Sequence, residues 1–168
     1  MSVRRLGVLS GALIGVVLLV GVVQAGAAGS VTVLKFHNPP GVSTGIGFNL
    51  NDPNAIPPLG SSIAIRAPLE NVGSQFGKPS GATVGRVLLQ CTVLTDYSAT
   101  GTIDGICNGI AHVPNGFLTF DGNGGFSNAS VNFYAVTGGV GPYANDRGSI
   151  KVVNHKDGSS DATVTLSS

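Results

Sequence analysis

Apolar and polar residues alternate with a period of two in short segments along most of the chain. The clearest case is 128–136, where Val131, Phe133 and Ala135 alternate with Asn132, Tyr134 and Val136. Such alternation is typical of a β-strand with one buried face. The pattern does not decide which of the two sets faces the interior. Because no long amphipathic helix pattern follows residue 28, we expect an all-β protein.

Short strands of this kind are separated by turn signals. Asn-Gly in the run Pro114–Asn115–Gly116 is a strong hairpin signal, and we expect further turns at 121–125 and at Lys156–Asp157–Gly158. The Pro- and Gly-rich segment 38–60 predicts a long loop around one short strand, of the kind that can cover a pocket. Regularly spaced short strands indicate a sandwich or a barrel, and periodicity alone does not separate the two. The predicted strands are 30–36, 45–49, 61–67, 83–94, 105–113, 117–120, 128–136, 149–153 and 162–166.

The N-terminus differs from the rest of the chain. Arg4 and Arg5 precede an apolar run over 6–23, and Ala25–Gly26–Ala27 then offers a small-residue cleavage site. We therefore expect residues 1–27 to be a signal peptide, 28–168 to be a single domain, and the mature protein to be secreted. A retained transmembrane anchor is the alternative interpretation of the same run.

The amino-acid composition limits the kinds of molecule that we expect the protein to bind. Charged residues make up 10% of the 168 residues, and the 26 glycines suit strands joined by tight turns. Once the signal peptide is removed, the remaining charges nearly cancel and form no basic patch. We therefore expect no nucleic acid partner.

The two cysteines, Cys91 and Cys107, predict one disulfide in an exported protein. Two buried free thiols are the alternative. Two thiolates alone make a poor zinc site, and the three histidines show no metal-ligand spacing, so we expect no metal. No G-K-[ST] phosphate loop is present, so we expect no nucleotide and no other cofactor.

The run 134–148, YAVTGGVGPYANDRG, resembles the conserved block of allene oxide cyclase-like and dirigent-like proteins. The resemblance extends over roughly 77–153, with departures at Val140 and Asp146. It implies an eight-stranded antiparallel barrel of lipocalin-like type, whose interior can hold one small ligand. It is also compatible with a homo-oligomer, a dimer or a trimer. The residues themselves suggest that Gly138, Gly139 and Gly141 form a tight corner between two strands, with at least one at positive φ.

The resemblance leads to three hypotheses about function. Allene oxide cyclases cyclise a fatty-acid epoxide, and dirigent proteins steer the coupling of phenoxy radicals. The first hypothesis is therefore an exported barrel that binds a small hydrophobic molecule and steers its cyclisation or coupling, an isomerase if it is an enzyme at all. The second is a carrier barrel for an apolar metabolite, and the third is a structural domain with a filled core.

Side chains inside dirigent barrels are thought to assist proton transfer to a quinone methide, which suggests candidates here. The resemblance points to Arg147 and Tyr134 as catalytic candidates, and we add Asp52 from the long loop. A structural ion pair is the alternative role of Arg147. Tyr143 and Phe133 are the candidate ligand-binding residues.

Overall fold

Nine antiparallel strands and one short 3₁₀ helix make up the part of the chain that the structure, a computed structural model, describes: residues 30–46, 49, 56–95, 103–126 and 130–168. Their bounds are β1 Val31–Asn38, β2 Val42–Ile46, β3 Ser62–Asn71, β4 Thr83–Val93, β5 Asp104–Val113, β6 Gly116–Gly125, β7 Val131–Val140, η1 Gly141–Tyr143, β8 Arg147–Asn154 and β9 Ser160–Ser167.

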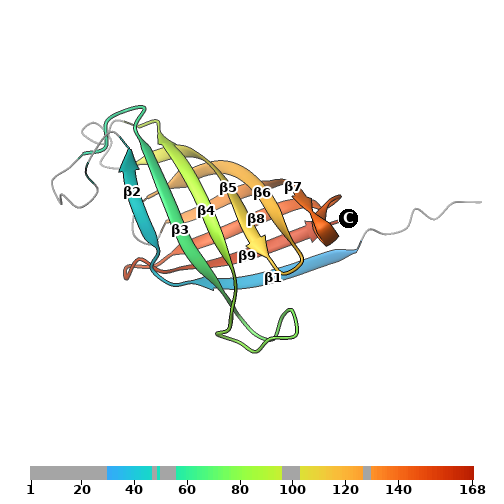
Figure 1. Ribbon diagram of the computed structural model, residues 1–168. Coiled ribbons are helices and arrows are strands. Elements are labelled where there is room, and N and C mark those ends of the chain that lie inside the picture. Colours follow the sequence, from blue (N-terminus) through green and yellow to red (C-terminus); the bar gives the residue numbers. More distant parts are fainter. Residues whose placement is uncertain (1–29, 47–48, 50–55, 96–102, 127–129) are drawn as a thin grey trace, which may run out of the picture.

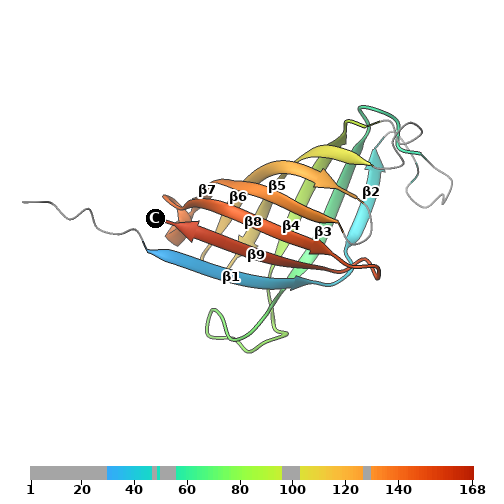
Figure 2. The same cartoon turned by 180° about the vertical axis from the view of Figure 1, so that it is seen from behind.

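Eight of these strands close into a barrel. Each strand from β3 to β9 pairs with the next along the chain, β9 pairs with β1, and β1 pairs with β3 through Phe36–Asn71 and His37–Glu70. The ninth strand, β2, adds to β3 outside this ring. The closed wall and the extra strand at its edge are visible from both sides (Figures 1 and 2). The prediction of an all-β, eight-stranded antiparallel barrel is therefore confirmed.

Strands β1 and β2 run along different parts of the same neighbour, β3. The end of β1 pairs with Glu70 and Asn71, whereas β2 pairs with the opposite half of β3. Pro39 and Pro40 separate the two, because proline has no N–H to donate to a ladder. This break brings residues 39–41 against the barrel interior.

On β7, the more polar of the two alternating sets of side chains faces the barrel interior. Asn132, Tyr134 and Val136 are buried, while Val131 and Phe133 are exposed on the outer face. The same alternation on the other strands fills the core with aliphatic and aromatic side chains. Full burial of each large apolar side chain contributes roughly 1.5–3 kcal/mol to folding.

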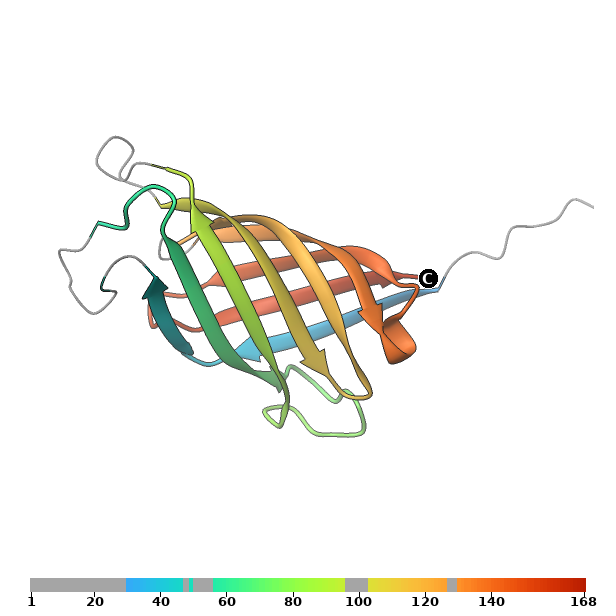
Figure 3. The same ribbon diagram turned by 45° about the horizontal axis from the view of Figure 1, so that its top comes forward.

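The two ends of the barrel differ. At one end, which we call the asparagine end, lie Asn38, Asn132 and Asn154 together with the β8–β9 turn. At the other end, which we call the η1 end, lie η1, the β5–β6 turn, the beginning of β1 and the end of β9 (Figure 3). Tyr143 is buried at the η1 end, and its hydroxyl donates to the Pro114 carbonyl oxygen at 3.5 Å.

Two sequence predictions about local structure are wrong. Residues 121–125 form the end of β6 rather than a turn, and the short strand expected over 45–49 lies at 42–46. In β6, a Cβ at Gly122 would lie 3.0 Å from the Tyr134 ring, and one at Gly124 would lie 2.5 Å from the Cys107 sulfur. These glycines therefore serve close packing inside a strand, although their composition is typical of a turn.

Gly138, Gly139 and Gly141, which we call the glycine block, include one residue with a backbone conformation that favours glycine. Gly138 and Gly139 continue β7, whereas Gly141 begins η1 with φ +72° and its Cβ would clash with the Asn115 carbonyl oxygen. The expectation that at least one of the three glycines has positive φ is confirmed, and the corner begins at Gly141.

These surroundings predict different costs for two alanine substitutions. We expect Gly141→Ala to lower the free energy of unfolding by roughly 1–2 kcal/mol, because Ala is strained at positive φ. Gly138→Ala is the matched control, since its Cβ would meet only the Thr119 hydroxyl, at 3.1 Å. Urea unfolding of both variants checks the difference. Equal stability of the two would contradict the assignment of the corner.

Candidate functional site

A cavity of about 340 Å³ lies inside the barrel. All eight barrel strands contribute to its wall, which is mainly aliphatic and aromatic. Representative lining residues are Phe36, Leu69, Leu89, Leu118, Phe120 and Val164. The volume lies within the usual range for sites that bind small molecules.

The polar lining residues gather on four adjacent strands at the asparagine end. They are Asn38 on β1, Ser160 on β9, Asn154 on β8 and Asn132 on β7, and we call them the asparagine arc. Asn38 Nδ2 donates to Ser160 Oγ at 3.0 Å. The Asn38 Oδ1 atom is buried without a hydrogen-bond partner among the described residues. The arc makes one side of this end polar.

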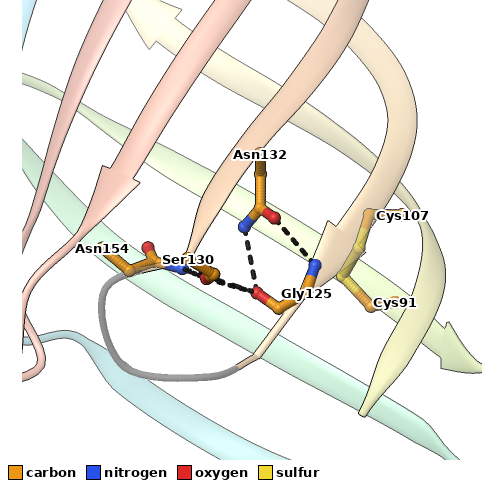
Figure 4. The surroundings of a disulfide bond; sticks show 6 residues. All are labelled: Cys91, Cys107, Gly125, Ser130, Asn132 and Asn154. Carbon is orange, nitrogen blue, oxygen red and sulfur yellow. Dashed lines mark hydrogen bonds between the residues drawn. A yellow bond between two sulfur atoms is a disulfide. The ribbon is translucent and has the colours of Figure 1, made fainter. Parts of the chain in front are cut away.

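A hydrogen-bonded cluster ties the arc to the end of β6. Asn132 accepts from the Gly125 N–H at 2.8 Å and donates to the Gly125 carbonyl oxygen at 3.0 Å, as a backbone strand would. Ser130 Oγ also donates to that oxygen, at 2.9 Å, and Asn154 Nδ2 donates to Ser130 Oγ at 2.8 Å. Figure 4 shows these contacts. They fix the Asn132 and Asn154 amides in place.

Tyr134 stands between the arc and the apolar wall. Its ring packs edge-on against Phe120, with centroids 5.5 Å apart, and a Cβ on Gly124 would lie 3.2 Å from its hydroxyl oxygen. Burial raises the pKa of the Tyr134 hydroxyl, and a hydrogen bond with the Asn132 side chain lowers it by less. Tyr134 therefore stays an uncharged phenol at neutral pH and can donate a hydrogen bond.

The predicted disulfide is confirmed. Cys91 and Cys107 are direct neighbours across β4 and β5, their sulfurs are 2.04 Å apart, and both are fully buried. The bond lies beside Asn132 and Gly125 at the asparagine end (Figure 4). It therefore joins two strands of the wall at the end of the barrel where the arc lies.

Of the predicted site residues that the structure describes, only Tyr134 lines the cavity. Arg147 is exposed and donates from Nη1 to the Asp146 carbonyl oxygen at 2.8 Å. Tyr143 is buried at the η1 end, Phe133 is 62% exposed on the outer face, and Asp52 lies outside the described residues. The roles of all five stay predictions, and the structure does not bring the four described residues together in one site.

The three asparagines of the arc were not identified as candidate site residues from the sequence. Asn132 could have been found, because it shares the alternating set of Tyr134 and Val136. Asn38 precedes two prolines and Asn154 precedes a turn, so both look like ordinary loop residues until the strand register is known.

No Asp, Glu, Lys, Arg or His side chain lines the cavity within the described ranges. The same ranges contain no cluster of three metal-ligating side chains and no helix long and apolar enough to cross a membrane. Two histidines instead bind one carboxylate next to the asparagine end: His37 Nδ1 and His155 Nε2 lie 2.9 and 3.0 Å from the two Asp161 oxygens. The hydrogen bond from His37 is the main cause that holds the pKa of Asp161 below its usual value, and His155 adds to it.

The lowered pKa predicts how Asp161 contributes to stability. The contribution is fully present above the unfolded value of 3.8 and is lost as the pH falls through the folded pKa, which lies lower. We expect Asp161→Asn to destabilise the protein at neutral pH, and the difference from wild type to shrink below pH 3.8. Urea unfolding as a function of pH measures it. If the difference in free energy of unfolding between wild type and Asp161→Asn is the same at neutral pH and below pH 3.8, the ionised Asp161 does not contribute to stability in this way.

Comparisons with known proteins extend the description of the barrel. No protein-family model matches the sequence, and no curated protein matches it. A pyocyanin demethylase structure has a TM-score of 0.61 and 17% identity, covering 80% of this chain and 99% of the other. The pterocarpan synthase dirigent protein PsPTS1 has a TM-score of 0.55 and 15% identity, covering 82% and 93%. An exo-specific intermolecular Diels-Alderase has a TM-score of 0.58 and 13% identity, covering 83% and 98%. The chain therefore has the barrel fold that dirigent proteins and Diels-Alderases share.

Proposed function

We propose that the mature protein is exported and that its barrel binds a small, uncharged hydrophobic molecule and steers the cyclisation or coupling of that molecule. The observation that carries the proposal is the interior cavity of about 340 Å³, with an apolar wall and a few fixed polar groups at one end. The dirigent proteins and Diels-Alderases of the same fold support the choice of reaction class. The buried disulfide is compatible with an oxidising, extracellular location.

Steering of this kind requires shape more than reactive side chains. A preference of about 1.4 kcal/mol between two bound conformers already gives a tenfold preference between two products. Phe120 and Tyr134, packed edge to face, form a rigid aromatic wall against which a ligand can be held. The Tyr134 hydroxyl adds a hydrogen bond that can stabilise negative charge developing on a ligand oxygen.

The proposal is tested by filling the cavity. Ala162 on β9 lines the cavity, and Ala135 on β7 lies on the outer face, so Ala162→Leu and Ala135→Leu add the same atoms to opposite sides of the wall. An environment-sensitive apolar dye should bind the wild type and Ala135→Leu equally. Its affinity for Ala162→Leu should fall about tenfold, which corresponds to 1.4 kcal/mol.

Thermal unfolding of Ala162→Leu shows whether the variant is folded, because overpacking costs about 1–3 kcal/mol. Competition by fatty-acid and phenolic compounds then identifies the ligand class. Equal dye binding by the two leucine variants would place the dye outside the barrel and contradict the proposal.

A carrier is the second candidate, favoured by the absence of a charged side chain among the described lining residues. The two functions differ in what is recovered after incubation. A carrier returns the bound compound unchanged, whereas a steering barrel changes the ratio of its products.

A further inference from the structure

The outer face of the barrel wall carries a hollow with a cationic lining, which we call the arginine hollow. Its volume is about 650 Å³, and it lies over β3, β4 and β5, beside residues 40–42 at the start of β2. These four strands run side by side (Figure 1). Arg66, Arg86 and His112 line the hollow, and Thr83 adds a hydroxyl group. No Asp or Glu is among the described residues that line it.

The strand register explains why these side chains meet. Arg86 on β4 lies opposite Pro68 on β3 and opposite His112 on β5. Arg66 is two positions before Pro68, so it shares the outer face of β3 and lies diagonal to Arg86. Diagonal neighbours in an antiparallel pair are within reach of each other when their side chains are long. Both arginines are exposed, whereas Val87, the next residue along β4, lines the interior cavity.

The two guanidinium groups have no counter-ion in the described part of the protein. Neither Arg66 nor Arg86 forms an ion pair or a side-chain hydrogen bond with another described residue, and the ion pairs of these ranges belong to Asp161. Two of the three arginines in residues 28–168 therefore lie in one hollow without a carboxylate. Because like charges repel, an anion bound between them relieves this repulsion and also accepts charge-assisted hydrogen bonds.

A second and more apolar hollow continues along the same outer face. Val42 and Arg66 line both hollows. The second one, of about 760 Å³, extends over Leu88 and Ile110 toward β7. The carboxylate among its described lining residues is Asp121 on β6, three strands away from Arg66. A ligand that spans the two hollows therefore meets positive charge at one end and apolar side chains along its body.

We propose that this outer face binds a small organic anion, with its carboxylate or phosphate group between Arg66 and Arg86 and its apolar body over Leu88. The guanidinium groups donate to the anionic oxygens, and His112 and Thr83 supply further N–H and O–H donors. The site is separate from the interior cavity, because neither arginine lines that cavity. It goes beyond the proposed function, whose ligand is uncharged and lies inside the barrel.

Two probes test the two parts of the site on the wild-type protein. Naphthoate joins a carboxylate to an apolar ring system, and inorganic phosphate is an anion without an apolar body. Exposed charge contacts are worth a factor of roughly two to five each, so Arg66→Gln/Arg86→Gln should lower the affinity for naphthoate about five- to tenfold. High salt, about 1 M, should reduce this difference by screening the charges. Leu88→Ala should weaken naphthoate about threefold and leave phosphate binding unchanged.

Two matched controls locate the bound anion. Lys151→Gln/Lys156→Gln removes the same net charge from β8 and the β8–β9 turn, outside the arginine hollow, and should change the affinity for naphthoate less than twofold. Ala162→Leu fills the interior cavity and should also leave naphthoate binding unchanged. Thermal unfolding confirms that each variant is folded.

Several outcomes would overturn the outer anion site. One is naphthoate binding that is equal in wild type and Arg66→Gln/Arg86→Gln, or that the lysine variant weakens as strongly. Another is loss of naphthoate binding in Ala162→Leu, which would place the anion inside the barrel. Binding to phosphatidylglycerol vesicles, without binding of naphthoate or phosphate, would identify the face as a lipid-binding surface instead. None of these results depends on whether the interior cavity binds an uncharged ligand.

Discussion

Replacing both Cys91 and Cys107 by alanine should lower the free energy of unfolding by about 3 kcal/mol. The two residues are 16 positions apart and joined by a disulfide. In the chain-entropy description, opening a loop of this length restores about that much conformational freedom to the unfolded chain. Both side chains are also fully buried, and Cys107 packs against Gly124, so the lost sulfur atoms leave unfilled space that adds to the cost.

Urea unfolding of the oxidised wild type, the reduced wild type and the double variant measures the effect. The reduced wild type should resemble the double variant, because both lack the bond. Thiol titration of the unfolded, non-reduced protein should find no free thiol. A double variant as stable as the oxidised wild type would show that the bond contributes no stability.

The disulfide also supports the wall of the cavity. A Cβ on Gly124 would meet both the Cys107 sulfur and the Tyr134 hydroxyl, so the three groups are packed directly together. Loss of the bond removes the covalent link between β4 and β5 at the asparagine end and leaves only their backbone pairing to hold the wall beside Tyr134. We therefore expect the double variant to bind apolar dye with less discrimination between ligands as well as to unfold more easily.

The strands were predictable from the sequence where alternation was regular, as on β7. The barrel came from the resemblance of the glycine block, because periodicity does not distinguish a barrel from a sandwich. The inner face of β7 was not predictable from polarity, since Asn132 faces inward and Phe133 outward. The reason is local: the Asn132 amide replaces a backbone partner for Gly125, which makes a buried asparagine favourable there.

The glycines of β6 show why composition misleads inside a barrel. Residues 121–125 have the composition of a turn, yet they form the end of a ten-residue strand. Their flexibility is not what the fold uses. The missing side chains leave room for Tyr134 and Cys107, two bulky groups contributed by the neighbouring strands β7 and β5. Which glycine makes room for which side chain on a neighbouring strand can be seen only when the strand register is known.

The largest single effect on the core is expected at Leu118. This residue is fully buried on β6 and lines the cavity, and its cross-strand neighbours are Ala111 on β5 and Gly139 on β7. Neither small neighbour can move into the space that a shorter side chain would leave. We therefore expect Leu118→Ala to lower the free energy of unfolding by about 2–5 kcal/mol and to enlarge the cavity.

Leu59→Ala is the matched control, because Leu59 is 66% exposed and its truncation should cost less than about 0.5 kcal/mol. Urea unfolding of both variants gives the difference. An apolar compound that fills the enlarged cavity should then restore part of the lost stability of Leu118→Ala, because a ligand that binds only the folded state stabilises it. If Leu118→Ala is as stable as Leu59→Ala, or if no apolar compound stabilises it, Leu118 is not part of the wall that bounds the binding cavity.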